Sequence, residues 1–327
     1  MFDVSVILPT YNRLSQLKHV LNGLEQQSYA KDKFEVVVVS DGSNDGTNEY
    51  LSNLQTAFSL KPLVQKNQGA AAARNTGIAA AAGEFALFID DDVVPTPDLV
   101  QLHMQTHKTS QNDLIILGPM LTPADYQMAP WVAWEQEMLY KQYNDMQQGR
   151  WQPTARQFYT GNASLARKYL VMAGGFDTQF RRAEDVELAY RLTKYDLQFV
   201  FLPEAIGYHY ANRSFRSWIS TPYEYGRNDV IFSQKKGQDW LLPTIFTEFH
   251  YRQPLIQRLI HALLDRPNVS KWTVNGLKAF AQIGAGLRLP RLPRIAYSCI
   301  FNLKYYQGVS DELGGRASFF AGVEAHS

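Results

Sequence analysis

The chain has 327 residues, of which 45% are hydrophobic and 19% charged, so it can bury a large core and is neither a disordered chain nor a coiled coil. Its single cysteine, Cys299, excludes a disulfide framework and a multi-cysteine zinc site. The formal charge of +1 lacks the overall basicity that is typical of nucleic-acid-binding proteins, so no nucleic-acid partner is expected.

The first third of the chain alternates between strand-like and helix-like segments. Short apolar runs predict strands at 4–8, 34–39, 63–65, 85–89 and 114–117. Apolar residues at helical spacing, or runs of alanine, predict helices at 14–24, 50–54, 70–82 and from 99 onward. We place Asp45 and Asp98 at helix N-caps and Gly83 at the end of the alanine-rich helix. This alternation predicts a largely parallel α/β sheet.

Polar residues follow three of these strands immediately. They are Thr10-Tyr11-Asn12, Asp41-Gly42-Ser43 and Asp90-Asp91-Asp92. Because ligands of parallel α/β sheets bind beyond the carboxyl ends of the strands, we expect the three clusters to meet at one edge of the sheet and form the site.

From about residue 120 the pattern changes. The sequence predicts an aromatic-rich helix near 131–143, a strand and turn at 158–164, a helix at 184–192 and a strand at 199–201 followed by 208–210. Beyond residue 235 we expect helices.

The acid triplet Asp90-Asp91-Asp92 is the first candidate site. Adjacent carboxylates repel one another unless a cation or several hydrogen-bond donors offset the repulsion. Mg²⁺ or Mn²⁺ held by one or two carboxylates and by substrate phosphates is one solution. A solvated acidic turn that caps the next helix is the other. The buried strand before the triplet and Pro95 after it favour a fixed, functional geometry.

Asp41 and Arg74 are candidates for ligand contacts. Asp41 can accept hydrogen bonds from a base edge or a ribose hydroxyl, although a turn and helix cap explain its neighbours well. The planar guanidinium of Arg74 can bind a phosphate or a base. Packing of an alanine-rich helix on a sheet explains the surrounding alanines equally well.

Glu184 and Asp185 open a predicted helix, where the helix dipole and free amides keep a carboxylate ionised and available as a general base. A capped helix with a Glu187–Arg191 pair explains the same pattern. His209 lies among aromatic residues and is either a structural histidine or, if the acid triplet binds an ion, a contact to that ion or to a phosphate.

Residues 250–327 contain ten Lys and Arg and four acids, whereas the rest of the chain contains 22 and 27. Arg288, Arg291 and Arg294 precede apolar residues through Leu303, a composition that suits an anionic membrane surface through 250–306. A helix packed on the catalytic body, or a homodimer contact, explains the segment as well. We find neither a signal peptide nor an apolar run of about 20 residues, and so expect a cytoplasmic protein, soluble or peripheral on the cytoplasmic face of the membrane.

Several segments together resemble the motifs of family 2 glycosyltransferases with the GT-A fold. They cover about residues 4–215, roughly two thirds of the chain, and occur in the family's order. The segments are Val-Ser-Val-Ile-Leu-Pro-Thr-Tyr-Asn-Arg (4–13), Val-Ser-Asp-Gly-Ser-Asn-Asp-Gly-Thr (39–47), Gly-Ala-Ala-Ala-Ala-Arg-Asn-Thr-Gly-Ile (69–78), Gly-Glu-Phe-Ala-Leu-Phe-Ile-Asp-Asp-Asp (83–92), Gly-Asn-Ala-Ser-Leu (161–165), Gly-Gly-Phe-Asp (174–177) and Glu-Asp-Val-Glu-Leu-Ala-Tyr-Arg-Leu (184–192).

The resemblance implies a mostly parallel sheet flanked by helices and an inverting, Mn²⁺- or Mg²⁺-dependent transfer of a sugar from a nucleotide-diphosphate donor. Residues at matching positions take the family's roles: Pro9, Thr10, Tyr11 and Asp41 for the nucleoside, Arg74 near the base or phosphates, Asp90 with Asp92 as the Asp-x-Asp motif, Asp91 near the ribose, Asp92 on the metal, His209 on the metal or diphosphate, and Asp185, beside Glu184, as the base. Ser40 departs from the family, which usually has an acid there.

The resemblance also divides the chain by function. Residues 1–235 are expected to form the catalytic domain, with a nucleotide-binding half at 1–120 and an acceptor half at 121–235. Residues 236–327 are expected to form a basic, mainly helical C-terminal region. The expected partners are a nucleotide-sugar, with a UDP-sugar favoured, and a saccharide or lipid-linked acceptor in cell-surface polysaccharide or glycolipid assembly.

Two other functions fit parts of the sequence. A nucleotidyltransferase also uses carboxylates and Mg²⁺, but it usually has a glycine-rich loop with Arg or Lys after the first strand, where this chain has only Arg13. A non-catalytic sugar- or membrane-binding module that kept the fold would not need the intact acids at 90–92 and 184–185. No Gly-x-Gly-x-x-Gly follows the first strand, which argues against a dinucleotide oxidoreductase.

Overall fold

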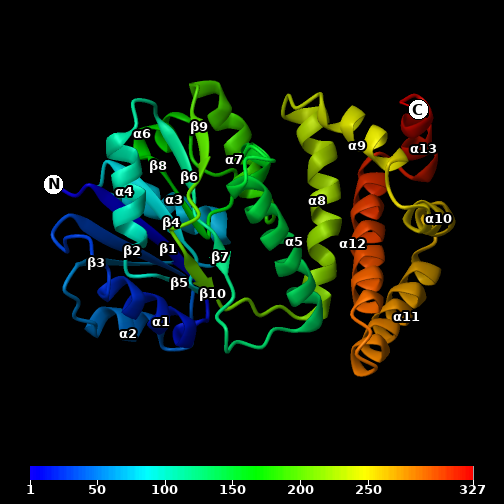
Figure 1. Cartoon of the computed structure of the whole chain (residues 1–327). Coiled ribbons are helices and arrows are strands. Elements are labelled where there is room, and N and C mark those ends of the chain that lie inside the picture. Colours follow the sequence, from blue (N-terminus) through cyan, green and yellow to red (C-terminus); the bar gives the residue numbers. More distant parts are fainter. Residues whose placement is uncertain (327) are drawn as a thin grey trace. The chain divides into compact units, whose positions relative to one another are not determined.

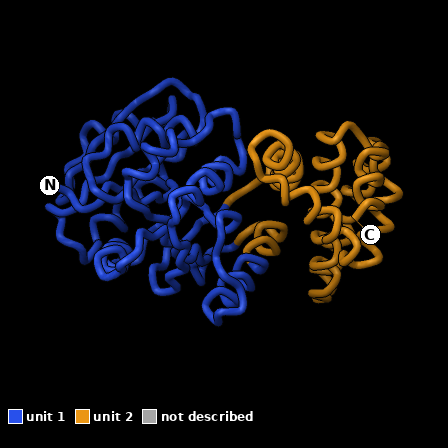
Figure 2. The backbone as a smooth tube through the Cα atoms, turned by 90° about the horizontal axis from the view of Figure 1, so that it is seen from above, with its two compact units in different colours: residues 1–127, 137–211 blue, residues 128–136, 212–327 orange. Residues whose placement is uncertain are grey.

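The computed structural model describes residues 1–326. They form two compact units, residues 1–127 with 137–211 and residues 128–136 with the chain from 212 onward (Figure 2). Each unit buries a hydrophobic core of its own.

Seven strands form the central sheet of the first unit: β1 (Val4–Thr10), β2 (Phe34–Asp41), β3 (Ser59–Gln65), β4 (Phe85–Ile89), β6 (Leu114–Leu117), β8 (Asn162–Ala166) and β9 (Gln198–Phe201). Their order is β3-β2-β1-β4-β8-β6-β9 (Figure 1). β3, β2, β1 and β4 are parallel, as are β6 and β9, whereas β8 runs antiparallel to both of its neighbours. The predicted α/β fold with a largely parallel sheet is confirmed.

Helices cover both faces of this sheet. They are α1 (Leu14–Glu25), α2 (Thr47–Asn53), α3 (Ala70–Ala80), α4 (Leu99–Thr109), α5 (Pro130–Gln147), α6 (Arg167–Met172) and α7 (Glu184–Leu192), with α5 beginning in the segment 128–136 of the second unit. Successive valines of β2 point to opposite faces, as strand geometry requires. Val36 and Val38 join the core formed with α1, α2 and α4, and Val37 and Val39 pack against Ala73 of α3.

Three short strands form a second sheet: β5 (Val93–Pro95), β7 (Met120–Leu121) and β10 (Gly207–His209). Its order is β5-β10-β7, and His209 pairs with Val93. The sequence does not predict β5 or β7, because two or three residues carry no detectable period. The pairing brings His209 next to Asp92, more than a hundred residues earlier in the chain.

The second unit is helical, as predicted for the C-terminal region. Its helices are α8 (Phe215–Lys235), α9 (Leu241–His250), α10 (Pro254–Leu263), α11 (Pro267–Gly286), α12 (Arg291–Glu312) and α13 (Arg316–Glu324). The second compact unit begins before α8, which packs along α12. No helix among residues 1–326 has the length and hydropathy needed to cross a bilayer.

Three of the predicted helix ends need correction. Gly46 rather than Asp45 is the N-cap of α2, and Asp45 accepts from the Leu14 amide at 2.8 Å through Oδ2. α3 ends at Ala80 rather than at Gly83, since Ala81 is already extended. Gly83 is required for another reason: a β-carbon there would overlap the backbone of Val4 and Ser5. Asp98 occupies the N-cap of α4, but its side chain makes no capping hydrogen bond. Gln27 supplies that bond instead, because its Oε1 accepts from the Val100 amide at 3.0 Å.

The crossing of α8 and α12 depends on glycines. A β-carbon on Gly226 would overlap the carbonyl oxygen of Tyr305, and one on Gly308 would overlap that of Tyr223. We predict that Gly226→Ala lowers the free energy of unfolding by about 1–3 kcal/mol, since added atoms force the two helices apart. Urea unfolding of the full chain, followed by far-UV circular dichroism, measures the change.

Gly276→Ala is the matched control. Gly276 lies inside α11, and no heavy atom lies within 4 Å of the position that a β-carbon would take there, so alanine should stabilise the helix by about 0.5–1 kcal/mol. If Gly226→Ala and Gly276→Ala shift the unfolding midpoint alike, the close approach of α8 and α12 is wrong.

Candidate active site

The carboxyl ends of β1, β2 and β4 meet at one edge of the central sheet. Thr10 pairs with Ser40 and Ile7 with Phe88, so Asp41, the last residue of β2, and Asp90, the residue after β4, lie beside the end of β1. The expected convergence of the three polar clusters is therefore present. Segments up to 81 residues apart in sequence are joined there by side-chain hydrogen bonds.

Asp91 and Asp92 are held by Arg13, the residue that precedes α1. One guanidinium nitrogen of Arg13 lies 3.0 Å from Oδ1 of Asp91 and 2.6 Å from Oδ2 of Asp92. The Thr10 hydroxyl donates to Oδ2 of Asp91 at 2.8 Å. Burial raises the pKa of Asp91 to about 6, and the charge of Asp92 adds to this effect, although Arg13 opposes it. The positive charge of Arg13 therefore offsets the repulsion between the two carboxylates.

His209 is the second partner of Asp92. Its Nε2 lies 3.5 Å from Oδ1 of Asp92, and the Tyr210 amide donates to the Asp92 carbonyl oxygen at 2.9 Å. Burial alone would raise the pKa of Asp92, but the hydrogen bond and charge of His209, together with Arg13, outweigh burial and lower it. Nδ1 of His209 is buried without a hydrogen-bond partner among residues 1–326.

Arg74 links the acid triplet to the start of α7. Its guanidinium donates to Oδ1 of Asp90 at 2.8 Å and to Oε1 of Glu184 at 2.9 Å, and it lies 5.7 Å from the ring centre of Phe176. Arg74 is only 5% exposed, so this arginine is a buried bridge, whereas the Asp90 side chain remains 35% exposed. Because Arg74 binds both Asp90 and Glu184, it fixes the distance between these two acids.

Asp185 stands next to Glu184 at the first turn of α7 and is half-buried. Its Oδ1 accepts a hydrogen bond from the Val186 amide at 2.8 Å. Burial and then the charge of Glu184 raise the pKa of Asp185 to about 7, against the opposing charge of Arg74. A carboxylate with a pKa near neutrality is suited to accept a proton from a substrate.

Asp41 has a different environment. Its carboxylate accepts three hydrogen bonds at 2.7–2.9 Å, from the side chain of Gln65 and from the amides of Gln68 and Gly69. Asp41 therefore holds the loop that leads into α3, and its contact with a nucleoside stays a prediction. Of the remaining predicted residues, Pro9 lies inside β1 opposite Val39, and Tyr11 is 49% exposed beyond its end.

Negative charge exceeds positive charge at this edge. Five carboxylates, Asp90–Asp92 with Glu184 and Asp185, share it with the two guanidinium groups of Arg13 and Arg74. Burial raises the pKa of Asp91 and Asp185, and repulsion from neighbouring acids of this set raises both further. The arrangement is electrostatically suited to a further cation.

Asp92 and His209 are the residues best placed to hold a divalent cation. Within residues 1–326, no three His, Cys, Asp or Glu side chains converge closely enough to hold a metal without other ligands. Mg²⁺ typically takes one or two protein carboxylates and completes its shell with water and substrate phosphates. Oxygen from Asp92 and the adjacent imidazole nitrogen therefore fit a cation that is shared with a phosphate ligand.

Sequence reasoning missed two supports of the site. From the sequence alone, Arg13 is only the single basic residue where a nucleotidyltransferase usually has a glycine-rich loop. In the structure Arg13 bridges Asp91 and Asp92, two of the three acids of the triplet. Asn162, in the motif Gly-Asn-Ala-Ser, pairs with Ile89 immediately before the triplet. Its side chain donates to the carbonyls of Pro119 and Ala205 and contacts His103, so this motif braces the strand end rather than facing a ligand.

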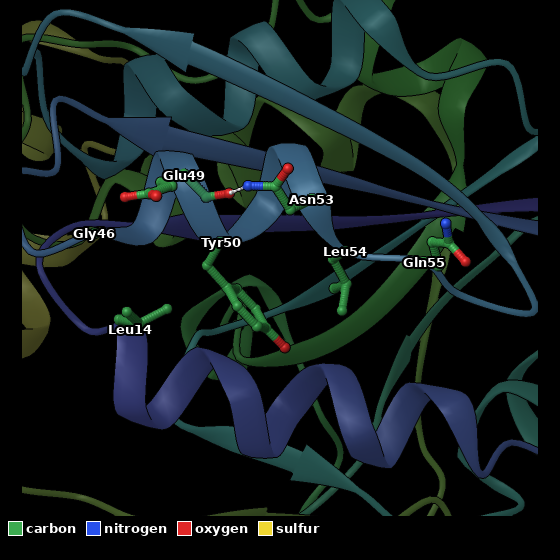
Figure 3. Close-up of a pocket in the computed structure, with 7 residues that line it drawn as sticks. All are labelled: Leu14, Gly46, Glu49, Tyr50, Asn53, Leu54 and Gln55. Atoms are coloured by element: carbon green, nitrogen blue, oxygen red, sulfur yellow. Dashed lines mark hydrogen bonds between the residues drawn. The ribbon is translucent and has the colours of Figure 1, made fainter.

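An open pocket lies elsewhere on the first unit, between α1 and α2 (Figure 3). Leu14, Tyr50 and Leu54 line it, and Asn53 donates to the Glu49 carbonyl at 2.9 Å across its wall. None of the predicted site residues lines this pocket. It is therefore separate from the charged edge of the sheet.

Arg74 supplies a direct test of the cluster. Arg74→Met leaves Asp90 and Glu184 without their shared cation, and we predict a loss of about 3–5 kcal/mol of unfolding free energy at pH 8. The loss should shrink at pH 5, which lies below the pKa of about 6 for Asp91 and about 7 for Asp185, because protonation of these two acids reduces the negative charge in the cluster. Lys168→Met removes the exposed pair with Asp113 and should leave the free energy of unfolding nearly unchanged at both values of pH, because water screens that pair. Equal costs for the two variants would contradict the buried bridge.

Known proteins provide a separate line of comparison. Glycosyltransferase AglE of Haloferax volcanii is 29% identical over 244 residues, which is 74% of this chain and 75% of the relative. TarS of S. aureus, in complex with UDP-GlcNAc, superposes with a TM-score of 0.59 at 20% identity and covers 94% of this chain and 90% of that one. Mannosyltransferase PcManGT from Pyrobaculum calidifontis, in complex with GDP-Man and Mn²⁺, gives a TM-score of 0.55 at 20% identity over 99% of this chain and 86% of that one.

The two structures are similar to this chain in fold. Among the first curated relatives that the chain matches, it spans between about half and three quarters of their length. The family model described as "Glycosyl transferase family 2" matches residues 5–172, which include β1 to β8 and the acid triplet. The chain belongs to glycosyl transferase family 2.

Proposed function

We propose that this chain is an inverting glycosyltransferase that moves a sugar from a nucleotide-diphosphate donor to an acceptor hydroxyl. One observation carries the proposal: Arg74 joins Asp90, in the acid triplet, to Glu184, which adjoins Asp185. A candidate phosphate and metal site and a candidate base thus belong to one connected set of side chains. Family membership supports the same reaction class.

The nucleoside is proposed to lie at the ends of β1 and β2. Pro9 and Thr10 end β1, Asp41 ends β2, and the exposed ring of Tyr11 is available for stacking on a base. Asp91 is proposed to lie near the ribose. TarS and PcManGT were solved with UDP-GlcNAc and GDP-Man, which supports a nucleotide-sugar donor, and we favour a UDP-sugar.

The diphosphate is proposed to lie beside the acid triplet, with Arg74 near its edge. Asp92 and His209 would hold Mn²⁺ or Mg²⁺, and the complex of PcManGT with Mn²⁺ supports use of a divalent ion. Such an ion supplies positive charge that stabilises a departing nucleoside diphosphate. Against the effect of burial, His209 and then Arg13 lower the pKa of Asp92 and so favour its ionised carboxylate.

Asp185 is proposed to be the general base. In its ionised form it takes the proton from the acceptor hydroxyl while the hydroxyl oxygen bonds to the anomeric carbon of the donor sugar. The bond from that carbon to the diphosphate oxygen breaks on the opposite face, which inverts the configuration. Glu184 raises the pKa of Asp185 and so makes it a better proton acceptor near neutral pH.

The acceptor is proposed to be a saccharide or a lipid-linked saccharide in cell-surface polysaccharide or glycolipid assembly. Support comes from TarS, whose full name is poly(ribitol-phosphate) beta-N-acetylglucosaminyltransferase, and from relatives named chondroitin synthase and hyaluronan synthase. We further propose that residues 1–235 carry catalysis, that the protein acts in the cytoplasm, and that 250–306 contacts the membrane face. A homodimer through 250–306 is the competing proposal.

Asp185→Asn tests the base. Release of nucleoside diphosphate from a panel of UDP- and GDP-sugars should fall by at least about 10²-fold, because the proton acceptor is lost. Donor binding by calorimetry should stay within about threefold, since Asp185 is not assigned to the donor. Asp32→Asn, an exposed acid before β2, should keep full turnover. Near-normal turnover in Asp185→Asn would remove that residue from the role.

The pH profile tests Glu184. The rate should rise with pH through about 7, because Asp185 must lose its proton to act as a base. In Glu184→Gln the neighbouring charge is gone and the pKa of Asp185 falls, so the acid limb should move to lower pH. If the acid limb of the pH–rate profile stays in place, a group other than Asp185 controls the rise of the rate with pH.

Asp92→Ala tests the metal site. For the unchanged protein, calorimetric binding of UDP should tighten when Mn²⁺ is added, because the cation neutralises both the acids and the diphosphate. In Asp92→Ala, addition of Mn²⁺ should give at least about tenfold less tightening. Asp98→Ala, whose exposed side chain makes no capping bond, should behave like the unchanged protein. A full Mn²⁺ response without Asp92 would exclude it as a ligand.

A further inference from the structure

α11 carries a row of exposed apolar side chains along one face. The row consists of Val269, Trp272, Phe280, Ile283 and Leu287, the last directly after the helix. Their spacing of three, four, seven or eight residues places them on the same side of a helix. Trp272 is 78% exposed and Ile283 60%, so these are not core side chains.

The opposite face of α11 is already used. Ser270, Val274, Ala281 and Gly284 are buried on it, and Val274 and Ala281 belong to the core formed with α8 and α12. Packing within the unit therefore does not account for the exposed row. Apolar side chains that gather on one helix face and stay exposed mark an interaction surface.

The charges around this row have one sign. No Asp or Glu occurs between Arg266 and Ser310. Lys271, Arg288 and Arg291 are exposed, and none of the three forms an ion pair within the part of the chain that the structure describes. Tryptophan and aliphatic side chains beside lysine and arginine are the composition of a helix that lies in the plane of an anionic lipid surface.

The basic segment chosen from sequence is placed differently. Tyr297, Ile300 and Leu303 of α12 are buried in the core of the second unit and are not available to a lipid surface. Arg288, Arg291 and Arg294, which open this segment, are exposed, as are Leu289 and Ile295. The candidate membrane surface therefore lies on α11 rather than on α12.

We propose that the apolar row of α11, flanked by Lys271, Arg288 and Arg291, binds the surface of an anionic lipid bilayer. The apolar side chains enter the interfacial layer and the cations meet the headgroup phosphates. This inference is independent of the proposed reaction, because no residue of the charged sheet edge takes part in it. The surface would hold the enzyme beside acceptors that are themselves linked to lipid.

Flotation of the full chain with vesicles tests the surface. With vesicles of equal parts phosphatidylglycerol and phosphatidylcholine the protein should float, and with phosphatidylcholine alone it should largely stay behind. Trp272→Ser combined with Ile283→Ser should reduce the bound fraction at least about tenfold, since two interfacial anchors are lost. Lys271→Glu combined with Arg288→Glu should reduce it similarly, and only for the anionic vesicles.

Val171→Ser combined with Met172→Ser is the matched control, because it removes two similarly exposed apolar side chains from α6 and should leave flotation unchanged. Circular dichroism checks that every variant keeps its helices. Sedimentation without lipid tests the alternative that a second copy of the chain binds this face. The proposal would be overturned if the unchanged protein sediments as a dimer and the variant with Trp272→Ser and Ile283→Ser sediments as a monomer. Failure of the unchanged protein to float would also overturn it.

Discussion

Repulsion among carboxylates is the constraint on which the site depends. The end of strand β4 and the start of helix α7 bring five acids to one edge of the sheet, where burial weakens the screening that water would provide. Arg13 and Arg74 offset part of this charge, each by bridging two acids. The remaining excess makes the edge receptive to a cation and keeps a proton acceptor near neutrality at Asp185.

The bridges also explain how distant segments act together. Arg74 sits on the alanine-rich helix α3, whose small side chains let it pack on the sheet, and its guanidinium reaches both the end of β4 and the start of α7. The short second sheet positions His209 in a similar way. It pairs His209 with Val93 and so places the histidine beside Asp92. Contacts between elements far apart in the chain thus position both side chains.

Much of this was accessible from sequence, and the rest was not for physical reasons. The strands at 85–89 and 114–117 have the predicted bounds, since continuous apolar runs identify buried parallel strands. The contact between His209 and Asp92 and the Arg74–Glu184 pair depend on pairings across about a hundred residues, which no local pattern encodes. Asp41 shows the converse: its position was predicted, but its three bonds to the 65–69 loop were not.

Anomalous X-ray scattering from crystals soaked with UDP and Mn²⁺ tests the central claim most directly. Nucleoside diphosphate and metal are predicted to bind together at the carboxyl ends of β1, β2 and β4, giving a manganese peak within coordination distance of Asp92. A manganese peak remote from Asp92, or UDP seated in the pocket between α1 and α2, would contradict the account.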